Sequence, residues 1–142
     1  MKSTRRNALL AAAALPAAAA QTKRAKQAHF RGEKPKETPL YSEAISYGDL
    51  VFISGHGVAA GDIRAQTKTV LDQIEAALKV AGSSLEKVLK ANVYLASLED
   101  YAAMNEAYRG RFGATPPVRT TVAVSGIPLP GCLVEIDVIA HR

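Results

Sequence analysis

With 142 residues, the chain has room for one domain, and 48% hydrophobic and 22% charged residues are fractions typical of a globular protein. Lys and Arg number 18 against 13 Asp and Glu, but nine of the cations lie within residues 1–36, and residues 37–142 carry nine cations against twelve acids. Because the basic excess is confined to the N-terminal arm, the body lacks the basic surface that binds phosphate groups, and we expect no nucleic-acid partner.

The first 20 residues resemble an export signal. Arg5 and Arg6 belong to a basic start, and an apolar, alanine-rich run over residues 8–20 offers Ala18, Ala19 and Ala20 as small residues for cleavage before Gln21. The paired arginines also resemble a twin-arginine signal, so this route and the general export route both fit. The run of 13 residues is shorter than the roughly 20 that span a bilayer. We therefore expect a signal over residues 1–20, export to the periplasm, and no membrane span after cleavage.

The folded domain is expected over residues 39–142. The segment 21–38 is rich in Lys, Gln and Pro and has no periodic apolar pattern, which indicates a flexible lead-in. At the start of the domain, a weak strand over 43–47 and a strong strand over 50–54 flank a Gly-Asp turn at 48–49. These features predict a hairpin.

Two helices and three strands complete the expected domain. In chain order they are helix 63–81, a helical turn at 83–86, strand 88–96, helix 101–112, and strands 117–124 and 132–139. Apolar spacings of three and four define the helices, and period-two alternation defines the strands. Gly82 supplies the stop for the first helix, and the second is expected to end near Gly113, ahead of two prolines that cannot continue it.

The resulting order, ββαβαββ, predicts an α+β domain with two helices on one face of a mixed sheet. No further helix is available for the other face, on which we expect Tyr94, Arg119 and Glu135. An uncovered sheet face of mixed polarity on a small domain predicts oligomerisation through that face.

The last two predicted strands each carry a charged residue, Arg119 and Glu135, on the side opposite to their valines. If the strands pair antiparallel across the 125–131 connection, a guanidinium and a carboxylate share one side of the sheet and could grip a small carboxylate-bearing molecule. The alternative is an exposed cross-strand ion pair, worth under about 1 kcal/mol. The alternating pattern alone favours the ion pair.

The sequence contains no motif of metal or covalent chemistry, since it has no Cys/His cluster, Gly-rich phosphate loop or nucleophile elbow. His29, His56 and His141 lie far apart in the chain, and we expect no metal site. Cys132 is the only cysteine, so no intramolecular disulfide can form, and its apolar neighbours indicate a buried thiol.

A more specific pattern extends over residues 38–141. Near the C-terminus, Pro-Val-Arg at 117–119 is followed by Leu-Val-Glu-Ile at 133–136. Upstream stand Tyr-Ser-Glu-Ala at 41–44, Val-Phe-Ile-Ser-Gly at 51–55, Asn-Val-Tyr-Leu at 92–95 and Met-Asn-Glu-Ala-Tyr at 104–108. In this order the segments resemble the reactive intermediate deaminase (RidA) family, also called the L-PSP endoribonuclease-like family.

The resemblance implies a chorismate-mutase-like fold and a homotrimer, whose sheets enclose a central barrel and whose three active sites lie between subunits. It also implies hydrolysis of reactive 2-imino acids, or their enamine tautomers, to 2-keto acids and ammonia without a cofactor. By position, Arg119 would bind the substrate carboxylate in a bidentate ion pair, and Glu135 would position and activate water. The substrate-binding residues implied by the same matches are Tyr41, Ser54, Gly55, Asn105 and Thr121.

Two positions depart from the family pattern. Thr121 stands where many deaminating members have Cys, and His56 stands where Gln is common. Two other functions therefore stay open. One is a non-catalytic binder of small carboxylates or keto acids in the cell envelope. The other, a ribonuclease, is less favoured because the body is acidic and has no paired-His constellation.

Overall fold

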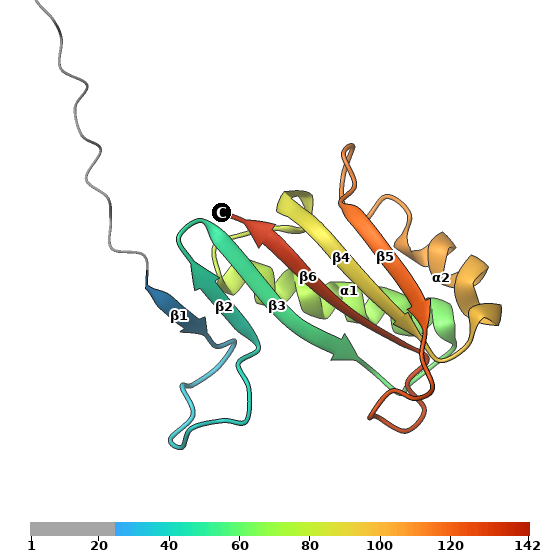
Figure 1. The fold of residues 1–142 in the computed structure, drawn as a ribbon, viewed down its shortest axis with the longest axis horizontal. Helices are drawn as coiled ribbons and strands as arrows, with labels where there is room; N and C mark the ends of the chain where they lie inside the picture. The colour runs from blue at the N-terminus through green and yellow to red at the C-terminus, as the bar shows by residue number, and fades with distance from the viewer. Residues whose placement is uncertain (1–24) are drawn as a thin grey trace, which may run out of the picture.

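The computed structural model describes residues 25–142, so the expected signal over residues 1–20 lies outside the described residues. Within them, a six-stranded mixed sheet in the order β1-β2-β3-β6-β4-β5 carries two α-helices on one face (Figure 1). The strands are β1 (Lys26–His29), β2 (Ala44–Tyr47), β3 (Leu50–Gly57), β4 (Val88–Leu95), β5 (Val118–Ala123) and β6 (Val134–His141). The helices are α1 (Ile63–Val80) and α2 (Tyr101–Tyr108), and short 3-10 turns at Leu85–Lys87 and Leu98–Asp100 precede β4 and α2. The predicted α+β class, with both helices on one face, is confirmed.

The hairpin of β2 and β3 forms where the sequence predicted it. Tyr47 pairs with Leu50 across the turn, and Gly48 has a φ of 58°, a conformation that residues with a Cβ rarely adopt. β3 continues beyond its predicted end, with a register shift between Ile53 and His56. Such a bulge changes which side chains of the strand face the helices.

The last two strands do not form the antiparallel pair that we expected. β6 pairs antiparallel with β3 on one side and with β4 on the other. β5 pairs parallel with β4 at the edge of the sheet. The physical reason is α2, because a helix between two strands returns the chain to the end of the sheet from which the first strand started. β4 consequently separates β5 from β6.

The hydrophobic core lies between the helices and the sheet. α1 begins at Asp62, whose Oδ1 accepts a hydrogen bond from the Ala65 N–H at 2.9 Å. Its apolar side packs on β3 and β6. α2 is shorter than expected: it ends at Tyr108, and Phe112 is buried from the turn that follows.

Gln66 connects α1 to the chain that leads into β6. Its side chain is buried, and Nε2 donates to the carbonyl oxygens of Gly61 and Gly131 at 3.1 and 3.0 Å. Its Oε1 accepts a hydrogen bond from the Leu133 N–H at 2.8 Å. These contacts fix the start of β6 and therefore the position of Glu135 two residues later.

The other face of the sheet is covered by no element within residues 25–142 (Figure 1). It carries the apolar side chains of Phe52, Val118 and Val122, which are 39, 68 and 42% exposed. Part of the predicted uncovered face is thus confirmed, but its composition differs from the prediction, because Arg119 is not on it.

β1 lies inside the segment 21–38, for which the sequence predicted no strand. It pairs antiparallel with β2, with Ala28 opposite Ile45. The first three residues of β1 are exposed. Its sequence has no alternation of apolar and polar residues, which is the pattern that predicted the other strands.

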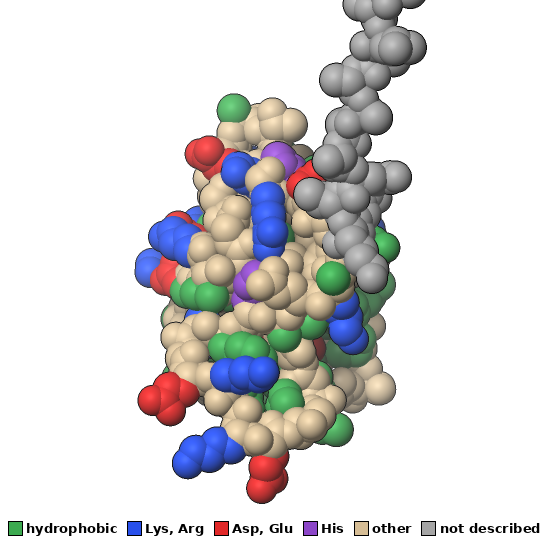
Figure 2. Space-filling model, turned by 90° about the vertical axis from the view of Figure 1, so that its left-hand side faces the viewer, with side chains coloured by type: hydrophobic (Ala, Val, Ile, Leu, Met, Phe, Trp, Pro, Cys, Tyr) green, Lys and Arg blue, Asp and Glu red, His purple; other side chains and the backbone are tan. Residues whose placement is uncertain are grey.

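The end of the molecule that carries β1 and β2 has acidic and basic side chains interspersed among hydrophobic and polar ones (Figure 2). On α1, Lys68 with Asp72 and Lys79 with Glu75 form exposed ion pairs one helical turn apart. Each such pair contributes less than about 1 kcal/mol to the free energy of unfolding. A search of the described helices finds none that is long and apolar enough to cross a membrane.

Candidate active site

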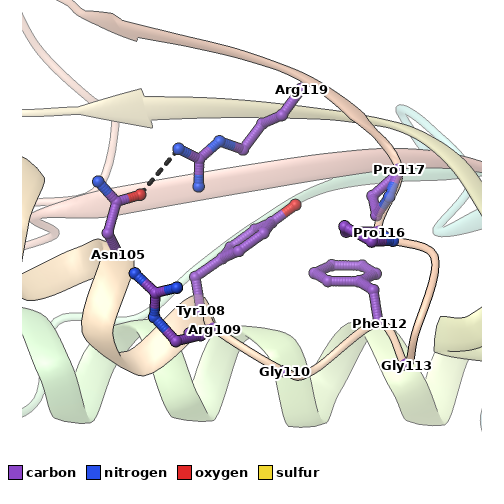
Figure 3. Close-up of a pocket in the computed structure, with 9 residues that line it drawn as sticks. All are labelled: Asn105, Tyr108, Arg109, Gly110, Phe112, Gly113, Pro116, Pro117 and Arg119. Atoms are coloured by element: carbon purple, nitrogen blue, oxygen red, sulfur yellow. Dashed lines mark hydrogen bonds between the residues drawn. The ribbon is translucent and has the colours of Figure 1, made fainter.

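Arg119 projects from β5 toward α2, on the face of the sheet that the helices cover. Its Nη2 donates a hydrogen bond to Asn105 Oδ1 at 2.8 Å, and its guanidinium carbon lies 4.6 Å from the centre of the Tyr108 ring (Figure 3). Asn105 and Tyr108 reach it together because residues three apart lie on one side of a helix. The aromatic ring attracts the cation electrostatically. No carboxylate within the described residues pairs with Arg119.

A pocket of about 340 Å³ opens beside this guanidinium (Figure 3). Its polar lining includes Arg119, Arg109 and Asn105, and its apolar wall includes Tyr108 and Phe112 with the prolines that precede β5. Two guanidinium groups and no acid line the pocket. This balance of charge favours an anionic ligand, and a planar guanidinium matches a carboxylate in bidentate geometry.

The turn after α2 gives the pocket its shape. Gly110 and Gly113, on either side of Phe112, have φ angles of 77° and 73°, which residues with a Cβ rarely adopt. The Phe112 ring packs on the Tyr108 ring with centroids 4.8 Å apart. Pro116 then brings the chain into β5 and toward Arg119.

Thr121 lies two residues beyond Arg119 on β5 and points to the same side of the sheet, because strand side chains alternate. Its Oγ1 is buried and has no hydrogen-bond partner among residues 25–142. Arg119, Asn105 and Thr121 thus form one group of predicted site residues, on the helix-covered face of β5.

Glu135 projects from β6 on the opposite, uncovered face. It lies against Gly55 of β3, where a Cβ atom would be 2.9 Å from the carboxyl carbon of Glu135. Tyr94 of β4 stands opposite Glu135 in the sheet, and both line a small pocket of about 160 Å³. Hydrogen bonding to Asp137 and partial burial raise the pKa of Tyr94, and the charge of Glu135 acts in the same direction.

Tyr41, Ser54 and Gly55 line a pocket of about 330 Å³ at the end of β3. Since Gly55 also touches Glu135, these residues form the second group of predicted site residues. Tyr41 is 70% exposed, so its ring is free to contact a ligand or a second chain.

A charged cluster borders the Tyr41 pocket. The Glu43 carboxylate contacts both Arg31 and His56, with His56 Nε2 at 3.1 Å. Although partial burial opposes ionisation, the hydrogen bonds from Arg31 and His56 lower the pKa of Glu43. His56, whose Nδ1 lies 2.9 Å from the Ser54 carbonyl oxygen, is thereby fixed beside the backbone of the pocket.

The expectation that Arg119 and Glu135 share one side of the sheet is wrong. β4 lies between their strands, and their side chains point to opposite faces. No ion pair joins the two residues, so the alternative drawn from the sequence is wrong as well. Within one chain, the structure brings the predicted residues together in two groups rather than one.

Tyr108 lines the Arg119 pocket but is not among the site residues predicted from the sequence. The available signal was the spacing of three from Asn105, which puts both side chains beneath the same strand. No group of three or more His, Cys, Asp or Glu side chains within residues 25–142 is arranged to hold a metal ion.

Comparison with known proteins shows which family the chain resembles in sequence and structure. The model of the family described as Endoribonuclease L-PSP matches residues 32–142. A RutC family protein of Pyrococcus abyssi is 40% identical over 126 residues, which are 83% of this chain and 98% of that protein. RidA from the Antarctic bacterium Psychrobacter sp. is 32% identical, with a TM-score of 0.73 over 82% of this chain and 99% of that one. A Mycobacterium tuberculosis member of the YjgF/YER057c/UK114 family is 35% identical, with a TM-score of 0.69 over 72% of this chain and 86% of that one.

Proposed function

The chain belongs to the YjgF/YER057c/UK114 (RidA) family, and we propose that it hydrolyses reactive 2-imino acids, or their enamine tautomers, to 2-keto acids and ammonia without a cofactor. The observation that carries the proposal is the set of groups that surround the Arg119 guanidinium. Its guanidinium is held by an amide and an aromatic ring, has no acidic partner among the described residues, and borders a pocket with no acidic lining.

Arg119 binds the substrate carboxylate in this proposal. Asn105 accepts one of the five guanidinium N–H donors, and the remaining N–H groups are available for a bidentate contact. Binding the carboxylate places the neighbouring imine carbon at a fixed distance from the guanidinium. Holding two reactants in place removes much of the entropic barrier to their reaction.

Glu135 positions the attacking water and accepts its proton. The water oxygen bonds to the imine carbon, Glu135 takes a proton from the water, and the imine nitrogen takes up a proton from solvent, which gives a carbinolamine. In the second step Glu135 gives its proton to the amino nitrogen, the hydroxyl proton passes to solvent as the keto C=O bond forms, and ammonia leaves. The carboxylate is therefore a general base and then a general acid, and no covalent intermediate with the protein is needed.

We place the complete site between subunits. In one chain, β4 separates Arg119 from Glu135, and their side chains occupy opposite faces of the sheet. A homotrimer that closes the uncovered faces would let the Arg119 group of one subunit meet Glu135 of the partner subunit. The resemblance of the sequence to the RidA family implies sites between subunits, which supports the arrangement.

The proposal is tested with an imino acid generated in situ by an amino-acid oxidase. The wild-type protein should accelerate the appearance of ammonia and keto acid, and Arg119→Ala should abolish the acceleration. Arg64→Ala is the matched control, because Arg64 pairs with Glu106 on the outer side of the helices. Unchanged hydrolysis by a folded Arg119→Ala protein would contradict the proposal.

A non-catalytic binder of small carboxylates or keto acids is the second candidate. One observation favours it: the Arg119 pocket is formed within a single chain, whereas Glu135 lies outside it. Thr121, which stands where many deaminating members have Cys, also favours binding without catalysis. Thermal stabilisation by 2-ketobutyrate without any turnover of the imino acid would support this candidate.

We also propose that the protein is exported, on the sequence of residues 1–20, which lie outside the described residues. The composition of this segment fits a cleaved signal. Fractionation of cells that express the full chain, with N-terminal sequencing, tests the proposal. Mature protein that starts near Gln21 in the periplasmic fraction is expected, and uncleaved protein confined to the cytosol would contradict it.

A further inference from the structure

Two buried side-chain polar atoms have no hydrogen-bond partner among residues 25–142, and both are hydroxyl oxygens on the side of the sheet that carries Arg119. They belong to Tyr108 and Thr121. A buried hydroxyl that makes no hydrogen bond destabilises a protein, so native structures rarely contain one without a reason. Of the two residues, Tyr108 lines the pocket beside the predicted carboxylate clamp, which points to a ligand as the missing partner of its hydroxyl.

The Tyr108 hydroxyl has a fixed direction. The residue is only 8% exposed, its ring packs on Phe112, and the Arg119 guanidinium lies over the ring. Figure 3 shows the hydroxyl oxygen pointing toward the β5 side of the pocket, between Arg119 and Pro117. The ring cannot turn away without losing these contacts, so the oxygen stays directed at the pocket.

The Tyr108 hydroxyl can also donate a hydrogen bond, and the pocket lacks an acceptor for it. Burial raises the pKa of Tyr108 to about 12, although the charge of Arg119 and its N–H groups near the hydroxyl oxygen act in the opposite direction. The proton is therefore retained at neutral pH. The other polar side chains of the pocket offer little to accept it. Arg119 and Arg109 only donate, and the Asn105 oxygen already accepts from Arg119.

We propose that the Tyr108 hydroxyl donates a hydrogen bond to the carboxylate that Arg119 binds, so that Tyr108 is a substrate-binding residue of this pocket. The proposal rests on the proposed function, because it takes the ligand to be a 2-imino or 2-keto acid held by Arg119. A guanidinium alone holds a carboxylate along one edge. A second donor from a rigid ring fixes the carboxylate against sliding along that edge, while Phe112 and the neighbouring prolines contact the side chain of the acid.

The test is the removal of one oxygen atom in Tyr108→Phe, with 2-ketobutyrate as the binding probe. Hydrogen bonds to charged groups are strong, so calorimetry should show a dissociation constant about tenfold higher or more. KM for the imino acid should rise by a similar factor while kcat stays within about twofold, because the contact is present before and during the chemical step. The melting temperature should stay equal or rise, because the hydroxyl has no protein partner to lose.

Tyr101→Phe is the matched control. Tyr101 also lies near Arg119, with its ring centre 6.0 Å from the guanidinium carbon, but it is 44% exposed and does not line the pocket. Its substitution should change neither affinity nor KM. A similar loss in both variants would overturn the proposal, because it would show that the effect does not depend on a hydroxyl buried in the pocket.

Arg119→Ala, measured with the same probe, separates this inference from the proposed function. If Arg119→Ala loses binding while Tyr108→Phe keeps wild-type affinity, the role of Tyr108 is refuted and the carboxylate clamp stands. If Arg119→Ala binds 2-ketobutyrate as tightly as wild type does, the clamp itself is refuted. A Tyr108→Phe protein that melts well below wild type would also overturn the proposal, since it would reveal a structural partner for the hydroxyl.

Discussion

Arg119 differs from three other arginines of the domain in what surrounds it. Arg31, Arg64 and Arg111 each contact a carboxylate, which neutralises their charge. Arg119 instead has an amide oxygen at one nitrogen and an aromatic ring against its face. These neighbours orient the guanidinium without neutralising it, so its charge is available to an anionic ligand.

Gly55 offers a test of Glu135 that leaves the carboxylate itself intact. A Cβ atom at position 55 would overlap the end of the Glu135 side chain, and Gly55 does not have a positive φ that would strain an alanine. In Gly55→Ala, the flexible carboxylate end should therefore move away while the fold persists. We expect kcat to fall about tenfold or more, with the free energy of unfolding changed by less than about 1 kcal/mol.

Gly32→Ala is the control for this substitution, because no atom lies within 4 Å of the Cβ position at Gly32 and its φ is not positive. Steady-state kinetics and urea unfolding on both variants check the prediction. Wild-type kcat in Gly55→Ala would show that the position of the Glu135 carboxylate does not control the rate.

Individual site residues were predictable only in part, and the reason is geometric. The resemblance assigned these residues to one site without saying which would touch. In the structure, Asn105 lies beside Arg119, and Gly55 lies beside Glu135. Period-two alternation correctly put Arg119 and Thr121 on one side of their strand. It could not say which side faces the helices, and the valines of β5 suggested the wrong one.

At the scale of elements, the order of the strands in the sheet was the main error. Short connections between adjacent strands often form hairpins, so β5 and β6 were expected to pair. The helix between β4 and β5 was the stronger constraint, because it delivers β5 parallel to β4. On the resulting edge strand, Val118 and Val122 face the uncovered side. Arg119 and Thr121 face the other side, where α2 offers Asn105 and Tyr108 as neighbours of Arg119.

β1 was not predicted because its attachment depends on side chains distant in sequence. His29 Nε2 lies 2.8 Å from Ser46 Oγ, and Arg142 Nη2 donates to the same oxygen at 2.8 Å. The Arg142 Nε also donates to the Ala81 carbonyl oxygen, which fixes the guanidinium at this edge. No local pattern in residues 26–29 encodes such contacts.

The attachment of β1 should weaken on acidification. Burial and then the charge of Arg142 lower the pKa of His29 below the ordinary value of 6.5. The unfolded or detached segment therefore binds a proton more readily than the folded one, and stability must fall as the pH drops through and below 6.5. Above that pH the contribution is fully present, because His29 is neutral in both states.

Hydrogen–deuterium exchange of residues 26–29 at pH 7.5 and 5.5, corrected for intrinsic exchange rates, measures this effect. Protection should decrease at the lower pH in wild type and change less in His29→Gln, which keeps a polar side chain but cannot titrate. An equal loss of protection in both proteins would assign the effect to other groups, such as Glu43, whose pKa is lowered.

At the scale of the molecule, the two groups of site residues and the uncovered sheet face suggest the same arrangement. The sheet leaves Phe52, Val118 and Val122 exposed on one face, and burial of apolar surface drives association. The same face carries Glu135, whereas Arg119 lies at the edge strand on the other face. A symmetric oligomer would bury the apolar face and repeat one contact between unlike surfaces around a closed ring.

The proposal that the subunits of a trimer share the site is tested with mixed trimers. Arg119→Ala and Glu135→Gln, each inactive alone, are co-expressed with different affinity tags, and particles that carry both tags are purified. If each site takes Arg119 from one subunit and Glu135 from the next, random assembly from equal amounts restores about a quarter of the sites before selection for both tags. Particles made from two differently tagged copies of the same variant should remain inactive. Mixed trimers without any activity would place both residues of a working site in a single chain, which would require Arg119 and Glu135 to meet across β4 by a rearrangement of the sheet.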